Sequence, residues 1–205
     1  MRYFEPYTEF RSRALNVPVK TPGGEEIFVE ITPGSSFGGE HKTTGLCVRG
    51  IEEIFKTRKI KTVLDLGCGS GILGISCATL GAENVLAIDI DPLAVDEARK
   101  NVKINRLDSK VRVENNSIED VRGKFDLVVA NIIRDELIRM AKEIKSVVEE
   151  NGILLVSGIF EDRKERAIST FKEIGFSLNR EFADGGWVAI LFSLEKTGSL
   201  LFSQD

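Results

Sequence analysis

Residues 65–71 read Asp-Leu-Gly-Cys-Gly-Ser-Gly, and this segment decides which fold the chain can adopt. It follows a β-branched and aliphatic run that ends at Leu66, and it precedes a helix-like stretch that begins at Gly71. In open α/β sheets, ligands bind outside the carboxyl ends of the strands, where such turns lie. Glycine lets the backbone adopt dihedral angles that a Cβ would forbid and lets it approach a ligand closely. We therefore expect an α/β domain with a ligand site at this turn.

Around this segment, short aliphatic runs alternate with amphipathic stretches, which is typical of parallel strands joined by crossover helices. The expected strands are Thr62–Leu66, Asn84–Asp89, Lys110–Glu114, Phe125–Ala130 and Gly152–Ser157. The expected helices are Gly71–Leu80, Pro92–Asn105, Asp135–Glu150 and Glu161–Gly175. Asp91 followed by Pro92 is a favourable pair for the N-cap and the first position of the second of these helices.

The two ends of the chain differ from this regular middle. Phe176–Phe182 and Trp187–Leu194 flank an Asp-Gly-Gly turn, which predicts a C-terminal antiparallel β-hairpin. Residues 1–42 are expected to form an irregular lead-in with a hairpin around Pro22–Gly24. The main domain then spans 43–194, with Thr43 and Thr44 as caps of its first helix, and 195–205 form a polar tail.

The composition narrows the function classes. Of the 205 residues 42% are hydrophobic, and no apolar run approaches the ~20 residues that cross a bilayer. The formal net charge of −4 argues against a broad nucleic-acid surface, which is normally basic. The N-terminus lacks the pattern of a signal peptide, so we expect a cytoplasmic protein. Cys47, Cys68, Cys77 and the single histidine His41 show no metal-ligand spacing, so no metal site is expected.

Two carboxylates indicate which ligand the glycine turn holds. Gly69, Gly71 and Gly74 satisfy the G-x-G-x-x-G pattern of dinucleotide binding, and Asp89 stands where a carboxylate accepts hydrogen bonds from a ribose. Asp89 suits either NAD or S-adenosylmethionine. Asp65 favours the second, because a carboxylate repels a pyrophosphate and attracts the ammonium of a methionyl group. Each acid also has a structural alternative, Asp65 as a cap of the next helix and Asp89 as a surface residue beside a capping Asp91.

The glycine segment and the following Ala-Ile-Asp-Ile-Asp-Pro at 87–92 resemble class I S-adenosylmethionine-dependent methyltransferases. Residues 32–44 resemble the PGxxFGTGTHxTT segment of the PrmA family, the lysine methyltransferases of large-subunit ribosomal protein eleven. Residues 130–133 and 186–188 are similar to two further segments of that family, and the likeness runs from about residue 17 to 194. The resemblance implies a Rossmann-like class I methyltransferase sheet, mainly parallel, with S-adenosyl-L-methionine as cofactor.

The same resemblance implies roles for single residues. Contacts with S-adenosylmethionine are implied for Thr44, Gly67, Asp89 and Asn131, and a position near the adenine for Ser117 and Ile118. Asp65 and Gly69 of the glycine turn complete the expected cofactor site. Two departures stand out: the segment between Gly38 and His41 is one residue shorter than in the family, and the N-terminal substrate-recognition domain of PrmA has no counterpart before Pro33.

Methyl transfer from a sulfonium is an in-line displacement, so it needs positioning and an unprotonated amine rather than an acid–base pair. We expect the amine to be a lysine or N-terminal amine of a protein such as a ribosomal protein. Enzymes that methylate amides or base nitrogens commonly carry a resembling Asn-Pro-Pro-aromatic segment, and residues 131–134 read Asn-Ile-Ile-Arg. The alternatives are a nucleic-acid or small-molecule N-methyltransferase, an NAD-binding oxidoreductase, and a binding module without turnover. No catalytic residue is assigned, since His41 fits a capping role better than that of a base.

Overall fold

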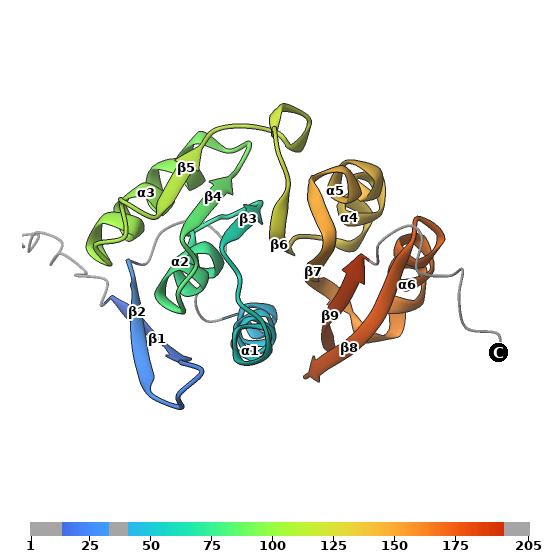
Figure 1. Cartoon of the computed structure of the whole chain (residues 1–205), viewed down its shortest axis with the longest axis horizontal. Helices are drawn as coiled ribbons and strands as arrows, with labels where there is room; N and C mark the ends of the chain where they lie inside the picture. Colours follow the sequence, from blue (N-terminus) through green and yellow to red (C-terminus); the bar gives the residue numbers. More distant parts are fainter. Residues whose placement is uncertain (1–13, 33–40, 195–205) are drawn as a thin grey trace, which may run out of the picture.

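Strand β3 (Thr62–Leu66) lies in the interior of the main sheet, with a parallel strand on each side, and four of its five residues are buried. The computed structural model describes residues 14–32 and 41–194. The seven-stranded main sheet has the order β5-β4-β3-β6-β7-β9-β8 (Figure 1). The other strands of this sheet are β4 (Asn84–Ile88), β5 (Val111–Glu114), β6 (Phe125–Asn131), β7 (Val148–Phe160), β8 (Phe176–Asp184) and β9 (Trp187–Leu194).

The direction of the strands confirms the expected fold class. From β5 to β7 neighbouring strands are parallel, whereas β9 pairs antiparallel with both β7 and β8. The predicted C-terminal hairpin therefore belongs to the main sheet and extends it at the β7 edge. The chain moves from β3 towards β5 and then crosses back to β6, so the strand order reverses between β3 and β6.

Helices cover both faces of the sheet, and two apolar cores result. Alternate strand residues point to opposite faces, so Val63 belongs to one core and Leu64 to the other. The first core packs against α1 (Lys42–Thr57), α2 (Ile72–Thr79) and α3 (Pro92–Ile104). The second packs against α4 (Arg134–Arg139), α5 (Ala141–Val147) and α6 (Lys164–Glu173), which lie together in Figure 1. Two short 3-10 helices, η1 (Ile118–Asp120) and η2 (Glu161–Arg163), follow β5 and β7.

The hairpin expected near the N-terminus is present as β1 (Leu15–Lys20) and β2 (Glu26–Ile31), which form a separate two-stranded sheet. Its Val19, Val29 and Ile31 are buried in the first core. The lead-in is therefore more regular than the sequence indicated, because its apolar face completes the core over α2. Residues 1–13, the shortened segment 33–40 and the polar tail 195–205 lie outside the described residues.

Two local predictions were wrong. The helix expected at Asp135–Glu150 is divided at Met140, whose ψ of 12° departs from helical geometry, and it ends at Val147 because Val148 pairs with Phe125 of β6. The cap of α1 is His41 rather than Thr43 or Thr44, which lie inside the helix. His41 Nδ1 accepts a hydrogen bond from Thr43 N at 3.3 Å, as a capping histidine does.

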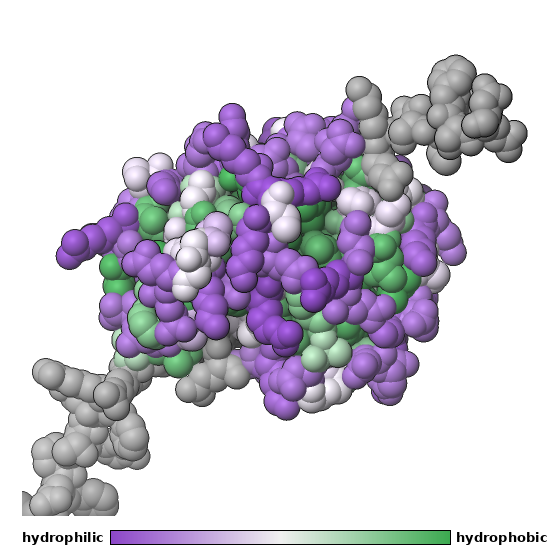
Figure 2. Space-filling view, turned by 60° about the horizontal axis from the view of Figure 1, so that its bottom comes forward, coloured by the Kyte–Doolittle hydropathy of each residue, from purple (hydrophilic) through white to green (hydrophobic). Residues whose placement is uncertain are grey.

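Other helix ends agree with the sequence. Asp91 caps α3 by accepting from Leu93 N at 2.9 Å, with Pro92 at the first helical position. The three cysteines are free and buried, as expected for small core thiols. Within the described ranges, no helix is long and apolar enough to cross a membrane. The face drawn in Figure 2 is dominated by hydrophilic side chains, with apolar ones in separate patches.

An aromatic cluster joins α6 to the terminal hairpin. Phe171 of α6 lies 5.8 Å from Phe176 of β8 and 5.3 Å from Phe192 of β9, measured between ring centroids. All three side chains are almost fully buried. The hairpin is thereby held to the second core by contacts that the helix supplies.

Replacing Phe171 by Ala should lower the free energy of unfolding by ~3–5 kcal/mol, because a fully buried ring leaves a cavity that cannot collapse completely. Urea denaturation measures the change. The control is Phe28→Ala, whose side chain is 56% exposed and should change stability by less than about 0.5 kcal/mol. Equal effects of the two substitutions would contradict a hairpin packed into the main core.

Candidate functional site

A cavity of about 860 Å³ opens at the carboxyl ends of β3, β4, β5 and β6. Its position matches the reversal of strand order between β3 and β6, which separates the crossover connections and leaves a crevice. The loop after β3 and the end of β4 form one wall, and the end of β6 forms another. The residues that line it include Thr44, Gly67, Gly69, Asp89, Ser117, Ile118 and Asn131. Seven of the eight residues predicted from the sequence are thus brought together.

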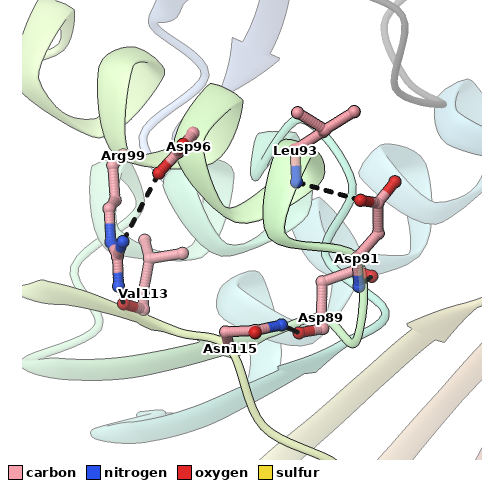
Figure 3. A network of polar contacts seen from close by, with 7 residues as sticks. All are labelled: Asp89, Asp91, Leu93, Asp96, Arg99, Val113 and Asn115. Carbon is pink, nitrogen blue, oxygen red and sulfur yellow. Dashed lines mark hydrogen bonds and ion pairs between the residues drawn. The ribbon is translucent and has the colours of Figure 1, made fainter.

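Asp89 is the most firmly held of these residues. Its Oδ2 accepts from Gly69 N at 2.9 Å, and its Oδ1 accepts from Asp91 N at 3.0 Å. Its backbone carbonyl accepts from Asn115 Nδ2 at 2.8 Å, as Figure 3 shows. The same hydrogen bonds that orient the carboxylate hold the glycine loop against the end of β4.

The neighbouring α3 and β5 are tied together in the same network. Arg99 of α3 donates to Val113 O from both Nε and Nη2, at 3.3 and 3.1 Å, and forms an ion pair with Asp96 (Figure 3). The hydrogen bonds of Arg99 join α3, which begins at Pro92, to β5. The carboxylate of Asp89 itself is held by main-chain groups of the glycine loop and of Asp91, the N-cap of α3.

The glycine loop has no room for a side chain at Gly67. Gly67 has φ of +67°, a left-handed conformation that favours glycine, and a Cβ placed there would lie 2.6 Å from Ile132 Cγ2. Backbone groups of the loop can therefore face the cavity at close range. Gly67 and Gly69 have no side chain, so they offer only main-chain groups to the cavity.

Two polar atoms on the cavity wall are buried without a partner. Thr44 Oγ1 and Asn131 Oδ1 have no hydrogen-bond partner within residues 14–32 and 41–194. Thr44 is 1% exposed, and both residues line the cavity from opposite elements, α1 and β6. Buried polar groups are costly unless they are paired, so these two atoms are candidate positions for contact with a polar ligand.

Asp65 is the exception among the predicted site residues. Its side chain does not appear on the cavity wall but lies beneath the loop, 1% exposed, where Oδ2 accepts from Gly74 N at 2.8 Å in the first turn of α2. The structural alternative, a carboxylate at the start of the next helix, is therefore the contact that forms. The pKa of Asp65 is raised to about 7. Burial is the main cause, the charge of Asp89 adds to it, and the hydrogen bond from Gly74 partly opposes it.

Three aromatic rings on the opposite wall were not predicted as site residues. Trp187 stacks on Phe160 with centroids 4.0 Å apart, and His41 meets Trp187 edge-on at 5.1 Å. All three line the cavity. Phe160 ends β7 after a bulge around Gly158, and only the pairing of β7 with β9 brings Phe160 opposite Trp187. The signals in the sequence were that Trp187 is the single tryptophan and that Phe160 follows the carboxyl end of a parallel strand.

Cys68 also lines the cavity, but it is not prepared to act as a nucleophile. Burial, together with the charges of Asp65 and Asp89, raises the pKa of its thiol well above the usual range, so the thiol stays protonated at neutral pH. In the described part of the chain, no group of three or more His, Cys, Asp or Glu side chains is arranged to hold a metal ion. The site is therefore defined by main-chain groups, carboxylates and aromatic rings.

The substitution Asp65→Asn keeps an oxygen that accepts from Gly74 N and removes the titrating carboxyl. The pKa of this carboxyl is about 7 in the folded chain, against 3.8 as the reference value. From about pH 4 to about pH 7 the folded state holds a proton that the unfolded state has released, so this carboxyl reduces stability as pH rises through that window. For such a shift the reduction is on the order of a few kcal/mol.

We therefore expect the wild-type chain to lose stability relative to Asp65→Asn as pH rises across that window, and not beyond it. Urea denaturation of both chains at several pH values measures the difference. A difference in free energy of unfolding that stays constant with pH would contradict the buried, titrating carboxyl. Comparing the two chains removes the contribution of every other titrating group.

Comparison with known proteins identifies the family of this chain. Residues 1–195 match the family described as Ribosomal protein L11 methyltransferase (PrmA). The chain is 41% identical over 169 residues to the ribosomal protein L11 methyltransferase of Thermoanaerobacter pseudethanolicus, an alignment that covers 82% of this chain and 54% of the relative. The chain spans about half the length of the curated relatives that it matches.

Solved structures agree. The crystal structure of a ribosomal protein L11 methylase from Lactobacillus delbrueckii subsp. bulgaricus has a TM-score of 0.76 and 33% identity, and covers 82% of this chain and 86% of that one. The structure of the N-methyltransferase NodS of Bradyrhizobium japonicum, in complex with S-adenosyl-L-homocysteine, has a TM-score of 0.63 and 13% identity. The match covers 77% of this chain and 90% of that one, and at this identity it supports only the similarity of fold. The family match over nearly the whole chain and the identity to these relatives show that this chain belongs to the PrmA family of ribosomal protein L11 methyltransferases.

Proposed function

We propose that the chain is an S-adenosylmethionine-dependent methyltransferase whose cavity at the carboxyl ends of β3 to β6 binds the methyl donor. The observation that carries this proposal is the carboxylate of Asp89, oriented on the cavity wall directly beside the glycine loop. A carboxylate at the end of the second parallel strand accepts hydrogen bonds from both hydroxyls of a ribose. Family membership supports the same reading, since the relatives are named as methyltransferases.

The residues present fit this cofactor. A cavity of about 860 Å³ is of the size that small-molecule sites occupy, and it leaves room for a substrate side chain beside the donor. Gly67 and Gly69 allow the loop backbone to approach the methionyl part. Ile118 is 4% exposed and offers an apolar surface to a purine, with Ser117 beside it.

Charge distinguishes this cofactor from NAD. Asp89 lies on the cavity wall, and the buried Asp65 lies beneath the glycine loop. A pyrophosphate at this loop would bring two further negative charges towards them, whereas an ammonium and a sulfonium would be attracted. The attraction would also lower the pKa of Asp65 and favour its ionised form. An oxidoreductase that binds NAD is therefore the less favourable reading of the same loop.

The bound donor would supply a methyl group on a positively charged sulfur, and the chain's own residues would position the acceptor. Asn131 Oδ1 is a buried acceptor on the cavity wall and is suited to receive an N–H of an amine. The stacked rings of Trp187 and Phe160 form an apolar part of the cavity wall. An amine in such surroundings has a lowered pKa, so it loses its proton to solvent before it attacks.

We further propose that the acceptor is an amine of a protein, on lysine or the N-terminus, and that a ribosomal protein is the natural substrate. The names of the relatives support this choice. Exposed apolar side chains at the mouth of the cavity, Ile90, Ile133 and Phe160, fit a macromolecular partner. Ile132 and Ile133 stand at the two proline positions of an Asn-Pro-Pro-aromatic segment and Arg134 at its aromatic position, so the segment has no proline or aromatic ring to stack on a planar base. A cytoplasmic location would accompany such a substrate.

The substitution Asp89→Ala should weaken binding of S-adenosylmethionine by ~1–3 kcal/mol, the scale on which charged hydrogen bonds are lost. Isothermal calorimetry measures the affinity. The control is Asp96→Ala, which removes an exposed ion pair on the neighbouring helix and leaves the cavity wall intact. Wild-type affinity in Asp89→Ala would overturn the assignment, and heat of binding with NAD instead of the methyl donor would favour the oxidoreductase.

The nature of the substrate is tested by transfer of label. Purified chain is incubated with cell lysate and a methyl-labelled donor, and separate portions are then treated with protease and with nuclease. We expect the label to be released by protease and to withstand nuclease, because the acceptor is a protein amine. Label that withstands protease and disappears with nuclease would replace the protein substrate by a nucleic acid.

A further inference from the structure

Helix α3 carries two asparagines, Asn101 and Asn105, one turn apart, and both bind the N-terminal hairpin. Asn105 pairs with both main-chain groups of Glu30, donating from Nδ2 to the carbonyl at 2.7 Å and accepting at Oδ1 from the N–H at 2.9 Å. Asn101 Oδ1 accepts from Thr32 N at 3.0 Å. The outer edge of β2 is thus paired with two amide side chains instead of with another strand.

Asn101 makes one contact that Asn105 does not. Its Nδ2 donates to the carbonyl of Ser70, in the glycine loop, at 2.9 Å. The side chain of Asn101 is completely buried and does not line the cavity. Ser70 is also buried, at 1% exposure, and it stands between Gly69, which donates to Asp89, and Gly71, which caps α2. One amide group therefore bridges the end of the hairpin and the centre of the loop.

We propose that Asn101 is a positioning residue that couples the β1–β2 hairpin to the glycine loop, so that the hairpin contributes to the affinity for the methyl donor without touching it. This inference rests on the proposed function of the loop as the donor site. The hairpin holds the amide through Thr32, and the amide holds the carbonyl of Ser70. Gly67 and Gly69 offer only main-chain groups to the cavity, and a small displacement of Ser70 moves the N–H groups on either side of it.

The physical basis is the burial of Asn101 and Ser70. A buried carbonyl and a buried N–H that lose their partner cost free energy unless the backbone moves towards another group. At Ser70 such a movement carries Gly69 with it, and Gly69 N is the group that fixes the Asp89 carboxylate. At Glu30, which is exposed, water can replace the lost partner. The two asparagines therefore differ in what their loss does to the site.

A matched pair of substitutions separates the two roles. Asn101→Asp keeps the oxygen that accepts from Thr32 N and replaces the donor to Ser70 by an oxygen, which repels the carbonyl. Asn105→Asp makes the same change one turn away, where Nδ2 donates to the carbonyls of Glu30 and of Asn101 and has no contact with the loop. The full 205-residue chain is used for both. The probe is S-adenosylhomocysteine, with its dissociation constant measured by calorimetry.

We expect Asn101→Asp to raise this dissociation constant about tenfold, which corresponds to about 1.4 kcal/mol. For Asn105→Asp we expect a change within about twofold, since it has no contact with the loop. Amide resonances of Gly69 and Gly71, followed by NMR in the ligand-free chain, should shift and exchange faster in Asn101→Asp only. A merely structural role would lower the melting temperature in both variants and leave these resonances and the affinity alike in both.

A second pair tests the hairpin side and does not place a charge in the core. Thr32→Pro removes the N–H that binds Asn101 Oδ1, and Thr32→Ala keeps it. We expect the dissociation constant for S-adenosylhomocysteine to rise about threefold or more in Thr32→Pro, since one neutral hydrogen bond is lost, and to remain at the wild-type value in Thr32→Ala. This pair also decides the question if Asn101→Asp does not fold.

The outcomes distinguish this inference from the proposed function. If the wild-type chain does not bind S-adenosylhomocysteine, the proposed function fails, and the Gly69 and Gly71 resonances still decide whether Asn101 positions the loop. If the wild-type chain binds and Thr32→Pro or Asn101→Asp binds equally well, the coupling is overturned. Equal weakening by Asn101→Asp and Asn105→Asp also overturns it, because the loop contact would then have no special effect.

Discussion

Strand β3 is hydrogen-bonded in parallel to β4 on one side and to β6 on the other, and this pairing places the carboxyl ends of three strands at one edge. The glycine loop, Asp89 and Asn131 meet there although 131 − 67 puts their outermost members 64 residues apart in sequence. A parallel sheet needs crossover connections, which leave through opposite faces beside β3 and cannot fill the crevice between them. The cavity is therefore a consequence of the strand order, and the side chains only determine which ligand fits it.

The two acidic residues of this edge illustrate how burial separates similar groups. Asp89 remains on the cavity wall, because Gly69 N and Asp91 N occupy part of its acceptor capacity and leave the rest directed to a ligand. Asp65 lies beneath the loop, where Gly74 N is its hydrogen-bond donor and burial raises its pKa to about 7. One carboxylate can bind a ligand directly, whereas the other acts through the start of α2 and through its charge. The same negative charges that disfavour a pyrophosphate suit a cationic methyl donor.

Elements outside the central strands also surround the site. The N-terminal hairpin contributes three buried side chains to the first core, and two asparagines of α3 pair with its outer edge. An edge strand that exposes its main-chain groups is open to unwanted pairing, and side-chain amides can cover such an edge at small cost. The terminal hairpin plays a similar part on the other side, where its turn brings Trp187 against Phe160. Both ends of the described chain thus support the cavity that the central strands create.

The sequence by itself determined the order and type of most elements, because apolar periodicity, the pair Asp91–Pro92 and the glycine turn act over a few residues. It also identified seven residues of the cavity wall. Gly67, Gly69, Asp89 and Asn131 follow or end parallel strands, whose carboxyl ends meet at one edge, and the resemblance to the PrmA family indicated Thr44, Ser117 and Ile118. Tertiary structure alone decided the rest. The early end of α5 follows from the pairing of Val148 with β6, which local propensity does not register. Three further contacts join groups that lie far apart along the chain or on different elements: Asp65 with Gly74, Trp187 with Phe160, and Asn101 with Thr32 and Ser70. Only the packed core determines which partners lie within reach of these groups.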